Sequence, residues 1–202
     1  MKGLLLKDLY MMKSYCKAYL VLILIFWIIG ASSKDSSFLT IYPCFLVSTI
    51  PITLQTYDEK EKWGSYSRTL PYSSGQLVSV KYLLNLMTTL LNLAMILLIR
   101  NPEESGMILC SAVPISILPT TFIMPIAFKF DTEKAKLCYI ILAIIVGAAC
   151  GVGFTAISHL TTFQKISIAP TLLAGIILTG TLIIYGISWN ISIKIYSRKE
   201  FT

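Results

Sequence analysis

Residues 58–71 read DEKEKWGSYSRTLP, and this charged and aromatic stretch separates two long runs without charge, 36–57 and 82–99. A helix needs about 20 mainly apolar residues to cross the hydrocarbon core of a bilayer. Both runs approach that length. The pattern therefore predicts two membrane-spanning helices joined by a polar connection, residues 58–81.

The composition of the whole chain is typical of a membrane protein. Apolar residues make up 55% of the 202 residues and charged residues 13%, whereas soluble domains carry about 25% charged residues. The net charge of +7 does not by itself indicate a nucleic-acid partner, because lysines are expected beside membrane spans. The chain also lacks a basic patch with interleaved aromatic residues, which single-stranded nucleic acids require.

Windows free of charge recur along the chain and predict an all-α membrane protein with six transmembrane helices. A charge at the middle of a membrane helix costs about 2.5–3.5 kcal/mol on insertion scales, which explains why charged residues are absent from these stretches. We expect a single transmembrane domain, residues 1–202, with spans at about 18–35, 36–57, 82–99, 105–128, 137–158 and 166–193.

The Lys and Arg residues are distributed unequally over the predicted loops. Fourteen of the 17 lie in the N-terminal arm, the second loop, the fourth loop and the C-terminal tail. The other three are Lys34, Arg100 and Lys165. Since cytoplasmic loops carry the excess of Lys and Arg, the pattern predicts that both termini lie in the cytoplasm.

The N-terminal arm, residues 1–17, has the pattern of an interfacial helix on the inner membrane surface. One arc of a helical wheel carries its lysines, and another arc, interrupted by Asp8, carries its large apolar residues. The residues that favour this interpretation are Lys2, Leu5, Lys7, Leu9, Lys13 and Lys17. The alternative is that the arm extends the first span into water.

The polar connection is predicted to contain a short helix. Asp58 followed by Glu61 matches a capping box, so a helix is expected to begin at Glu59. Pro71 disfavours helical backbone at the residue before it, so the helix is expected to end near residue 70.

Trp63, Tyr66 and Leu70 share one side of this predicted helix. Two interpretations are open from the residues alone. The rings are typical of the headgroup belt of a membrane. They are equally typical of anchors that fill a groove on a cytoplasmic partner.

Two segments of the chain resemble permease subunits of bacterial ABC-type exporters. They are MKGLLLKDLY at residues 1–10 and YDEKEKWGSYSRTLPYSSGQLVSVKYL at residues 57–83. The chain is similar to the small six-span permeases of the phenol-soluble modulin exporter family. The resemblance covers the topology of the whole chain and about 37 residues by motif. Its motif residues are Asp58, Glu59, Lys60, Glu61, Lys62, Trp63, Tyr66, Leu70, Pro71 and Lys81.

The resemblance implies that the 58–70 helix is a coupling helix seated on a separate ATPase subunit, and that the N-terminal arm is a connecting helix. It implies a dimer of permeases with two ATPases in a bacterial cell membrane. The second permease is either identical or a related chain. The residues expected to couple to the ATPase are Asp58, Glu59, Glu61, Lys62, Trp63, Tyr66, Leu70 and Pro71.

Nothing in the chain indicates catalysis. No G-x-x-x-x-G-K-[ST] motif occurs, so ATP and Mg²⁺ are expected on the partner ATPase. His159 is the only histidine, and the five cysteines form no C-x-x-C pair. We therefore expect no metal site, no cofactor and no enzymatic activity in this chain.

The third predicted span carries a polar stripe. Its residues are Asn85, Thr88, Thr89 and Asn92, at i, i+3, i+4 and i+7 on one helix face. Lining a cargo path is one interpretation of the stripe. The interpretation we rank first is hydrogen bonding between helices, worth about 0.6 kcal/mol on average, because no charge joins the stripe.

Prolines interrupt two of the predicted spans. Pro43 and Pro51 lie in the second span, and Pro114, Pro119 and Pro125 in the fourth. Proline removes a backbone donor and kinks a helix. Three in one span predict a bent or broken helix, which acts as a gate or simply packs against its neighbours.

The nearly uncharged spans favour hydrophobic or amphipathic cargo, for example amphipathic peptides moving out of the cell. The alternative is the substrate-binding membrane subunit of a vitamin-type importer, although no convergent polar cluster is found near the outer face. A membrane-embedded enzyme is the third hypothesis. It would need acids, histidines or a nucleophile with a base inside the spans. The interiors of the spans contain no Asp, Glu, Lys or Arg, and the single histidine lies at a border.

Overall fold

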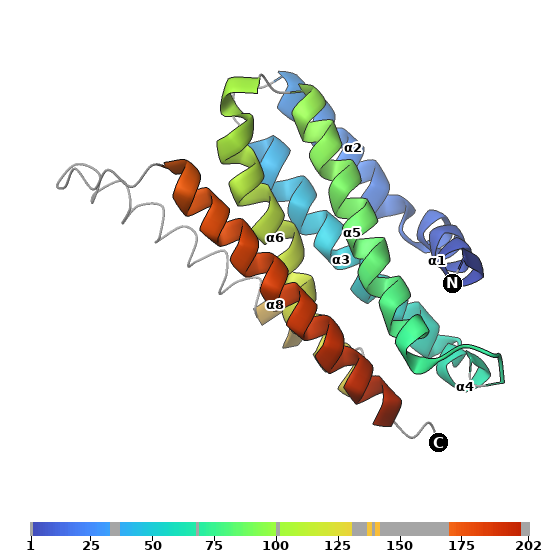
Figure 1. Ribbon diagram of the computed structural model, residues 1–202. Coiled ribbons are helices and arrows are strands. Elements are labelled where there is room, and N and C mark those ends of the chain that lie inside the picture. The colour runs from blue at the N-terminus through green and yellow to red at the C-terminus, as the bar shows by residue number, and fades with distance from the viewer. Residues whose placement is uncertain are drawn as a thin grey trace.

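The computed structural model describes residues 2–32, 37–67, 69–99, 102–130, 137–138, 140–141 and 170–198. Its helices are shown in Figure 1: α1 (Lys2–Tyr15), α2 (Lys17–Ser32), α3 (Ser37–Lys60), α4 (Trp63–Ser67), α5 (Ser74–Ile99), α6 (Pro102–Lys129) and α8 (Pro170–Arg198). The described residues form no strand, which confirms the all-α prediction for this part of the chain.

Two described segments are long and apolar enough to cross a membrane, Ser74–Ile99 and Ala112–Lys129. Helices α1 and α2 give a third candidate if they count as one broken span, with a bend of 74° between them. The count of six spans stays a prediction. The predicted span 137–158 lies almost wholly outside the described residues.

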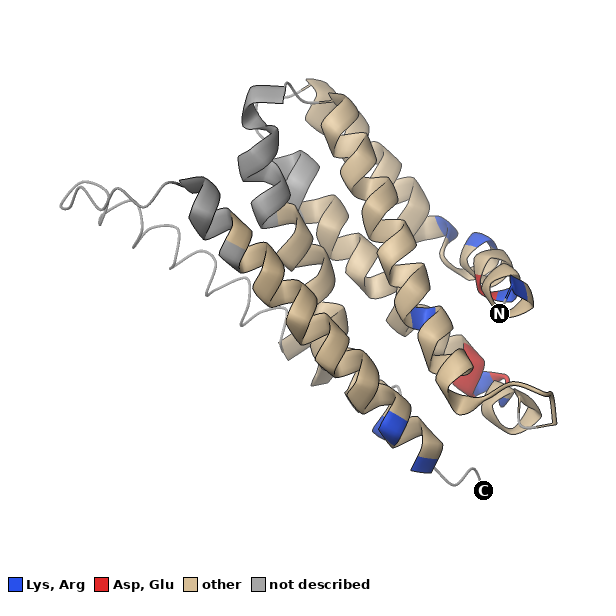
Figure 2. Cartoon of the chain, viewed as in Figure 1, with Lys and Arg blue, Asp and Glu red and all other residues tan. Residues whose placement is uncertain are grey.

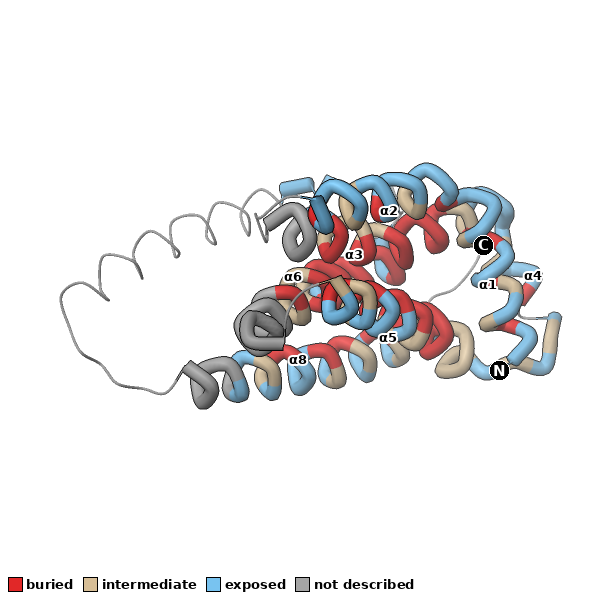
Figure 3. Tube along the Cα trace, turned by 90° about the horizontal axis from the view of Figure 1, so that it is seen from above, coloured by how far each residue is buried: buried red, intermediate tan, exposed pale blue. Residues whose placement is uncertain are grey.

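The long helices pack side by side in a bundle. Helix α6 contacts α8 and α3 most extensively, and α3 also packs against α2 and α5. Figure 3 shows buried residues where α3, α5 and α6 face one another, and exposed residues on the outward sides of α2, α5 and α8. Those outward sides are apolar, for example Ile28, Leu98 and Ile183. A surface helix of a soluble protein would carry polar residues there, so these apolar sides are suited to contact with membrane lipid.

Most charged residues of the described part gather toward one end of the bundle. Figure 2 shows them around α1, around α4 and at the C-terminal end of α8. This arrangement is the one expected when the bilayer excludes charge from the rest of the bundle. It agrees with the predicted grouping of the N-terminal arm, the second loop and the C-terminal tail on one side.

The predicted start of a helix at Glu59 is wrong. Helix α3 continues through Asp58 to Lys60, and the amide of Glu61 still donates to the carbonyl of Tyr57 at 3.0 Å. A separate short helix, α4, begins at Trp63. Asp58 does not act as an N-cap because its carboxylate is engaged by two lysines instead.

The break between α3 and α4 occurs at Lys62, whose φ of 54° lies in the left-handed region. This conformation costs a non-glycine residue roughly 1–2 kcal/mol. We expect Lys62→Gly to raise the free energy of unfolding by about 0.5–1 kcal/mol, because part of the gain is lost to the greater freedom of glycine in the unfolded chain. Lys62→Ala removes the same charge but keeps the strain, so it should give no gain. Thermal unfolding of the purified protein in detergent compares them, and equal midpoints would contradict the assignment of strain.

Helix α6 stays continuous from Pro102 to Lys129 despite its three internal prolines, so the fourth span is not broken. Pro125 leaves the carbonyl of Thr121, four residues earlier, without its helical donor. The Ser188 hydroxyl on α8 donates to that carbonyl at 2.6 Å. A neighbouring helix thus replaces the lost bond, as membrane helices with proline require.

Candidate functional site

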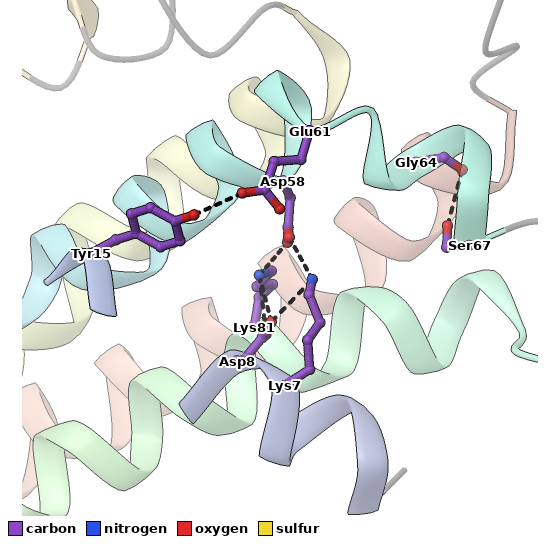
Figure 4. Close-up of polar contacts among 8 residues, drawn as sticks. All are labelled: Lys7, Asp8, Tyr15, Asp58, Glu61, Gly64, Ser67 and Lys81. Carbon is purple, nitrogen blue, oxygen red and sulfur yellow. Dashed lines mark hydrogen bonds and ion pairs between the residues drawn. The ribbon is translucent and has the colours of Figure 1, made fainter. Parts of the chain in front are cut away.

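Four charged side chains from three helices form a charge cluster at the end of the bundle that carries α4 (Figure 4). The cluster consists of Lys7 and Asp8 on α1, Asp58 on α3 and Lys81 on α5. The Lys81 ammonium lies 2.5 Å from Asp58 Oδ2 and 3.0 Å from Asp8 Oδ2. The Lys7 ammonium lies 2.5 Å from Asp58 Oδ1 and 3.5 Å from Asp8 Oδ1. Each cation thus contacts both carboxylates, and the net charge of the cluster is zero.

The charge cluster is withdrawn from solvent. Asp8, Asp58 and Lys81 are 2%, 4% and 4% exposed. Taking a charge out of water is costly, so buried charges persist only when they are paired. The cluster therefore fixes α1, α3 and α5 to one another, because separating any one of these helices would break two of the ion pairs that join them.

The sequence contains one signal for this cluster. Asp8 interrupts the apolar arc of the N-terminal arm, and the structure shows that it faces Lys81 on α5. An acidic residue in the apolar arc of a helix predicts a buried cationic partner, but it does not identify which one. From the sequence, Lys81 is assigned to the motif, and Asp58 to the helix cap, the motif and the coupling residues, but neither is paired with Asp8.

A second contact ties the α1–α2 junction to the end of α3. The Tyr15 hydroxyl donates to Glu61 Oε1 at 2.9 Å, and the Tyr15 ring stacks on Tyr57 with centroids 4.1 Å apart. The hydrogen bond to the Glu61 carboxylate raises the pKa of Tyr15, because it stabilises the neutral phenol. Helix α1 is thus attached at its middle, through Lys7, and at its C-terminal end, through Tyr15, to the corner where α3 meets α4.

The other predicted residues of the interfacial helix have mixed environments. Lys2, Lys13 and Lys17 are exposed, as the predicted lysine arc requires, whereas Lys7 enters the charge cluster. Leu9 is 36% exposed, and the buried apolar residues of α1 are Leu4 and Met11. The lipid contact of α1 stays a prediction.

The aromatic residues predicted to couple to an ATPase lie together on α4. The rings of Trp63 and Tyr66 are 5.4 Å apart, and Tyr66 is 57% exposed. Trp63 is half-buried, because the Lys7 ammonium lies over its ring, 3.9 Å from the centroid. Lys7 therefore joins the charge cluster directly to α4.

The remaining predicted coupling residues surround α4. Leu70 is half-buried and Pro71 exposed in the turn that follows α4, whereas Glu61 and Lys62 are exposed at the break that precedes it. Glu59 is half-buried in the last turn of α3. The structure thus brings most of these residues to one corner, but α4 itself has only five residues and is shorter than predicted.

The four residues of the polar stripe are buried among the helices. Trp27 Nε1 donates to Asn92 Oδ1 at 3.1 Å, and Asn92 Nδ2 donates to Cys44 Sγ at 3.1 Å, so Asn92 links α5 to α2 and α3. The Thr88 and Thr89 hydroxyls donate to carbonyls of their own helix. These contacts agree with helix packing, and a cargo path along the stripe stays a prediction.

A hydrogen-bonded chain that the sequence did not predict joins α5, α6 and α8. The Ser188 hydroxyl has one hydrogen, which it donates to the Thr121 carbonyl. In its contact with Tyr82 it must therefore accept, so the Tyr82 hydroxyl donates to Ser188 Oγ at 2.9 Å. The Ser192 hydroxyl in turn donates to the Tyr82 oxygen at 2.7 Å. The Tyr82 ring also stacks on Trp189, with centroids 5.5 Å apart.

Among the described residues, no group of three or more His, Cys, Asp and Glu side chains is arranged to hold a metal ion. The candidate site consists of helices joined by the charge cluster and of the aromatic residues on α4. It offers contacts to another molecule at α4, and the charge cluster connects those contacts to three helices.

A family model described as "ABC-2 family transporter protein" matches residues 3–197, nearly the whole chain. No curated protein and no solved structure matches the chain.

Proposed function

The chain belongs to the ABC-2 family of transporter proteins, and we propose that it is the permease subunit of an ATP-driven exporter in a bacterial cell membrane. Membership of the family implies an ABC ATPase as a partner in general. In our proposal, ATP and Mg²⁺ are bound by that separate subunit, and two permeases, identical or related, assemble with two ATPases. Both termini then lie in the cytoplasm.

The observation that carries the proposal is the connection of α4 to the charge cluster. An ATPase that contacts Tyr66 and Trp63 would act on a helix already fixed to α1, α3 and α5. A displacement of α4 would therefore be transmitted to the helices that cross the membrane. This is the requirement for a coupling helix, and it favours docking over the headgroup interpretation of the two rings.

Amphipathic peptides are the cargo we propose. The outward sides of the described helices are apolar, and the buried polar side chains beyond the charge cluster are neutral amides and hydroxyls. An amphipathic molecule is compatible with such surroundings, whereas charged residues, which often mark the path of an ion, are not found in the interiors of the predicted spans.

Removing the aromatic corner is expected to release the ATPase. In Trp63→Ala and Tyr66→Ala variants, an ATPase that co-purifies with the wild-type chain in mild detergent should be retained about tenfold less, because buried aromatic anchors contribute 2 kcal/mol or more at many interfaces. The measurement is the ratio of ATPase to permease after affinity purification.

Tyr10→Ala provides the matched control, since Tyr10 is 65% exposed on α1 and lies outside the corner. It should leave the ratio unchanged. Undiminished retention in both corner variants would overturn the assignment of α4. Cells that lack the permease and its ATPase should also become sensitive to added amphipathic peptides.

A further inference from the structure

A cavity of about 480 Å³ lies beside the charge cluster. Its lining comes from α1, α3, α4 and α5, and from single residues near the ends of α6 and α8. The volume is within the range of sites that bind small molecules or short segments. The cavity thus lies between helices and is partly open to its surroundings.

The walls of the cavity differ in chemistry. Leu77, Val80 and Phe128 supply an apolar wall, and the charge cluster supplies a polar one, seen in Figure 4 as the side chains around Lys81. The charged residues of the lining are Lys7, Lys62, Lys81, Asp8, Asp58 and Glu59. Cations and anions are equal in number, so the cavity is suited to an amphipathic molecule with little net charge.

Gln55 points to a ligand. It lines the cavity, is 8% exposed, and has no hydrogen-bond partner for its side chain within the described part of the chain. The amide atoms of Gln55 are not among the polar atoms that are shut off from solvent, so they open onto the cavity and can bond there to water or to a ligand. Lys62 and Ser65 lie on the same lining, and Lys62 has no acidic partner among the described residues.

We propose that this cavity receives one end of an amphipathic peptide before its transport. The peptide backbone bonds to the Gln55 amide, which offers both donors and an acceptor. Apolar side chains of the peptide lie against Leu77, Val80 and Phe128. A membrane lipid is disfavoured as the occupant, because the lining comes from six helices instead of one lipid-facing side, and because the charges are balanced.

The inference rests on the proposed function, and a labelling experiment tests it separately. The permease–ATPase complex is purified into phosphatidylcholine nanodiscs and exposed to a synthetic amphipathic helical peptide of near-zero net charge that carries a diazirine. After illumination, mass spectrometry locates the adducts. We expect them at residues 55–65 and 77–81, with an excess of unlabelled peptide suppressing them.

Gln55→Leu is the informative variant, because it keeps the size of the side chain and removes only its hydrogen bonds. It should reduce labelling about fivefold, which corresponds to one net hydrogen bond. Asn190→Leu, at an exposed amide of α8 outside the cavity, should leave labelling unchanged.

Adducts confined to the outward helix sides, or labelling equal in Gln55→Leu and wild type, would refute the cavity as a peptide site. In a second experiment, the diazirine is placed on the permease at Leu77. Cross-links from this position to the ATPase would show that the partner subunit occupies the cavity, and they too would refute the peptide site. If the ATPase still associates through Trp63 in these experiments, the proposed function stands while the inference fails. If no ATPase associates, the proposed function fails.

Discussion

Lys81→Met is expected to lower the free energy of unfolding by about 3–5 kcal/mol, the cost of removing one partner from a buried ion pair. Lys81 is 4% exposed and contacts both Asp8 and Asp58. Without its charge, two buried carboxylates would share the single ammonium of Lys7. Thermal unfolding of the purified permease in detergent measures the loss.

A double variant separates the buried charge from the packing of the side chain. Lys81→Met combined with Asp58→Asn leaves Lys7 opposite Asp8 alone, so much of the loss should be recovered. The coupling energy from the double-mutant cycle should therefore be large, above about 1 kcal/mol. Additive effects of the two substitutions would show that the four charges do not act as one cluster.

Tyr82→Ala is expected to cost about 3–5 kcal/mol, the usual range for deleting a buried aromatic side chain. Tyr82 is 0% exposed and its ring contacts Tyr185 and Trp189 on α8. Deletion would leave a cavity between α5 and α8 and would also break the hydrogen-bonded chain from Ser192 to the Thr121 carbonyl.

Tyr82→Phe distinguishes the ring from its hydroxyl. It preserves the stacking and removes the hydrogen bonds to Ser188 and Ser192, so a loss of about 1.2 kcal/mol is expected, at an average of about 0.6 kcal/mol for each such bond in membrane proteins. Both variants are compared by thermal unfolding in the same detergent. A Phe variant as unstable as the Ala variant would mean that the hydrogen-bonded chain, and not the ring packing, joins α5 to α8.

Part of the candidate site followed from local sequence. The spacing of Trp63 and Tyr66 places their rings on one side of a helix turn, and the structure has them adjacent. The bounds of that helix did not follow, because the capping pattern at Asp58 depends on which groups its carboxylate meets. In the structure these are two lysines, from α1 and α5.

The sequence by itself determined that the chain is helical and belongs in a membrane, because the bilayer demands long apolar segments and places charge beyond them. That demand acts on each segment separately, so composition and spacing suffice to detect it. Only the tertiary structure decided that Asp8 meets Lys81, 73 positions away in sequence. It likewise decided that Ser188 bonds to the carbonyl freed by Pro125. Such pairs depend on how three helices cross, and the pattern along a single helix holds no information about the rotation of its neighbours.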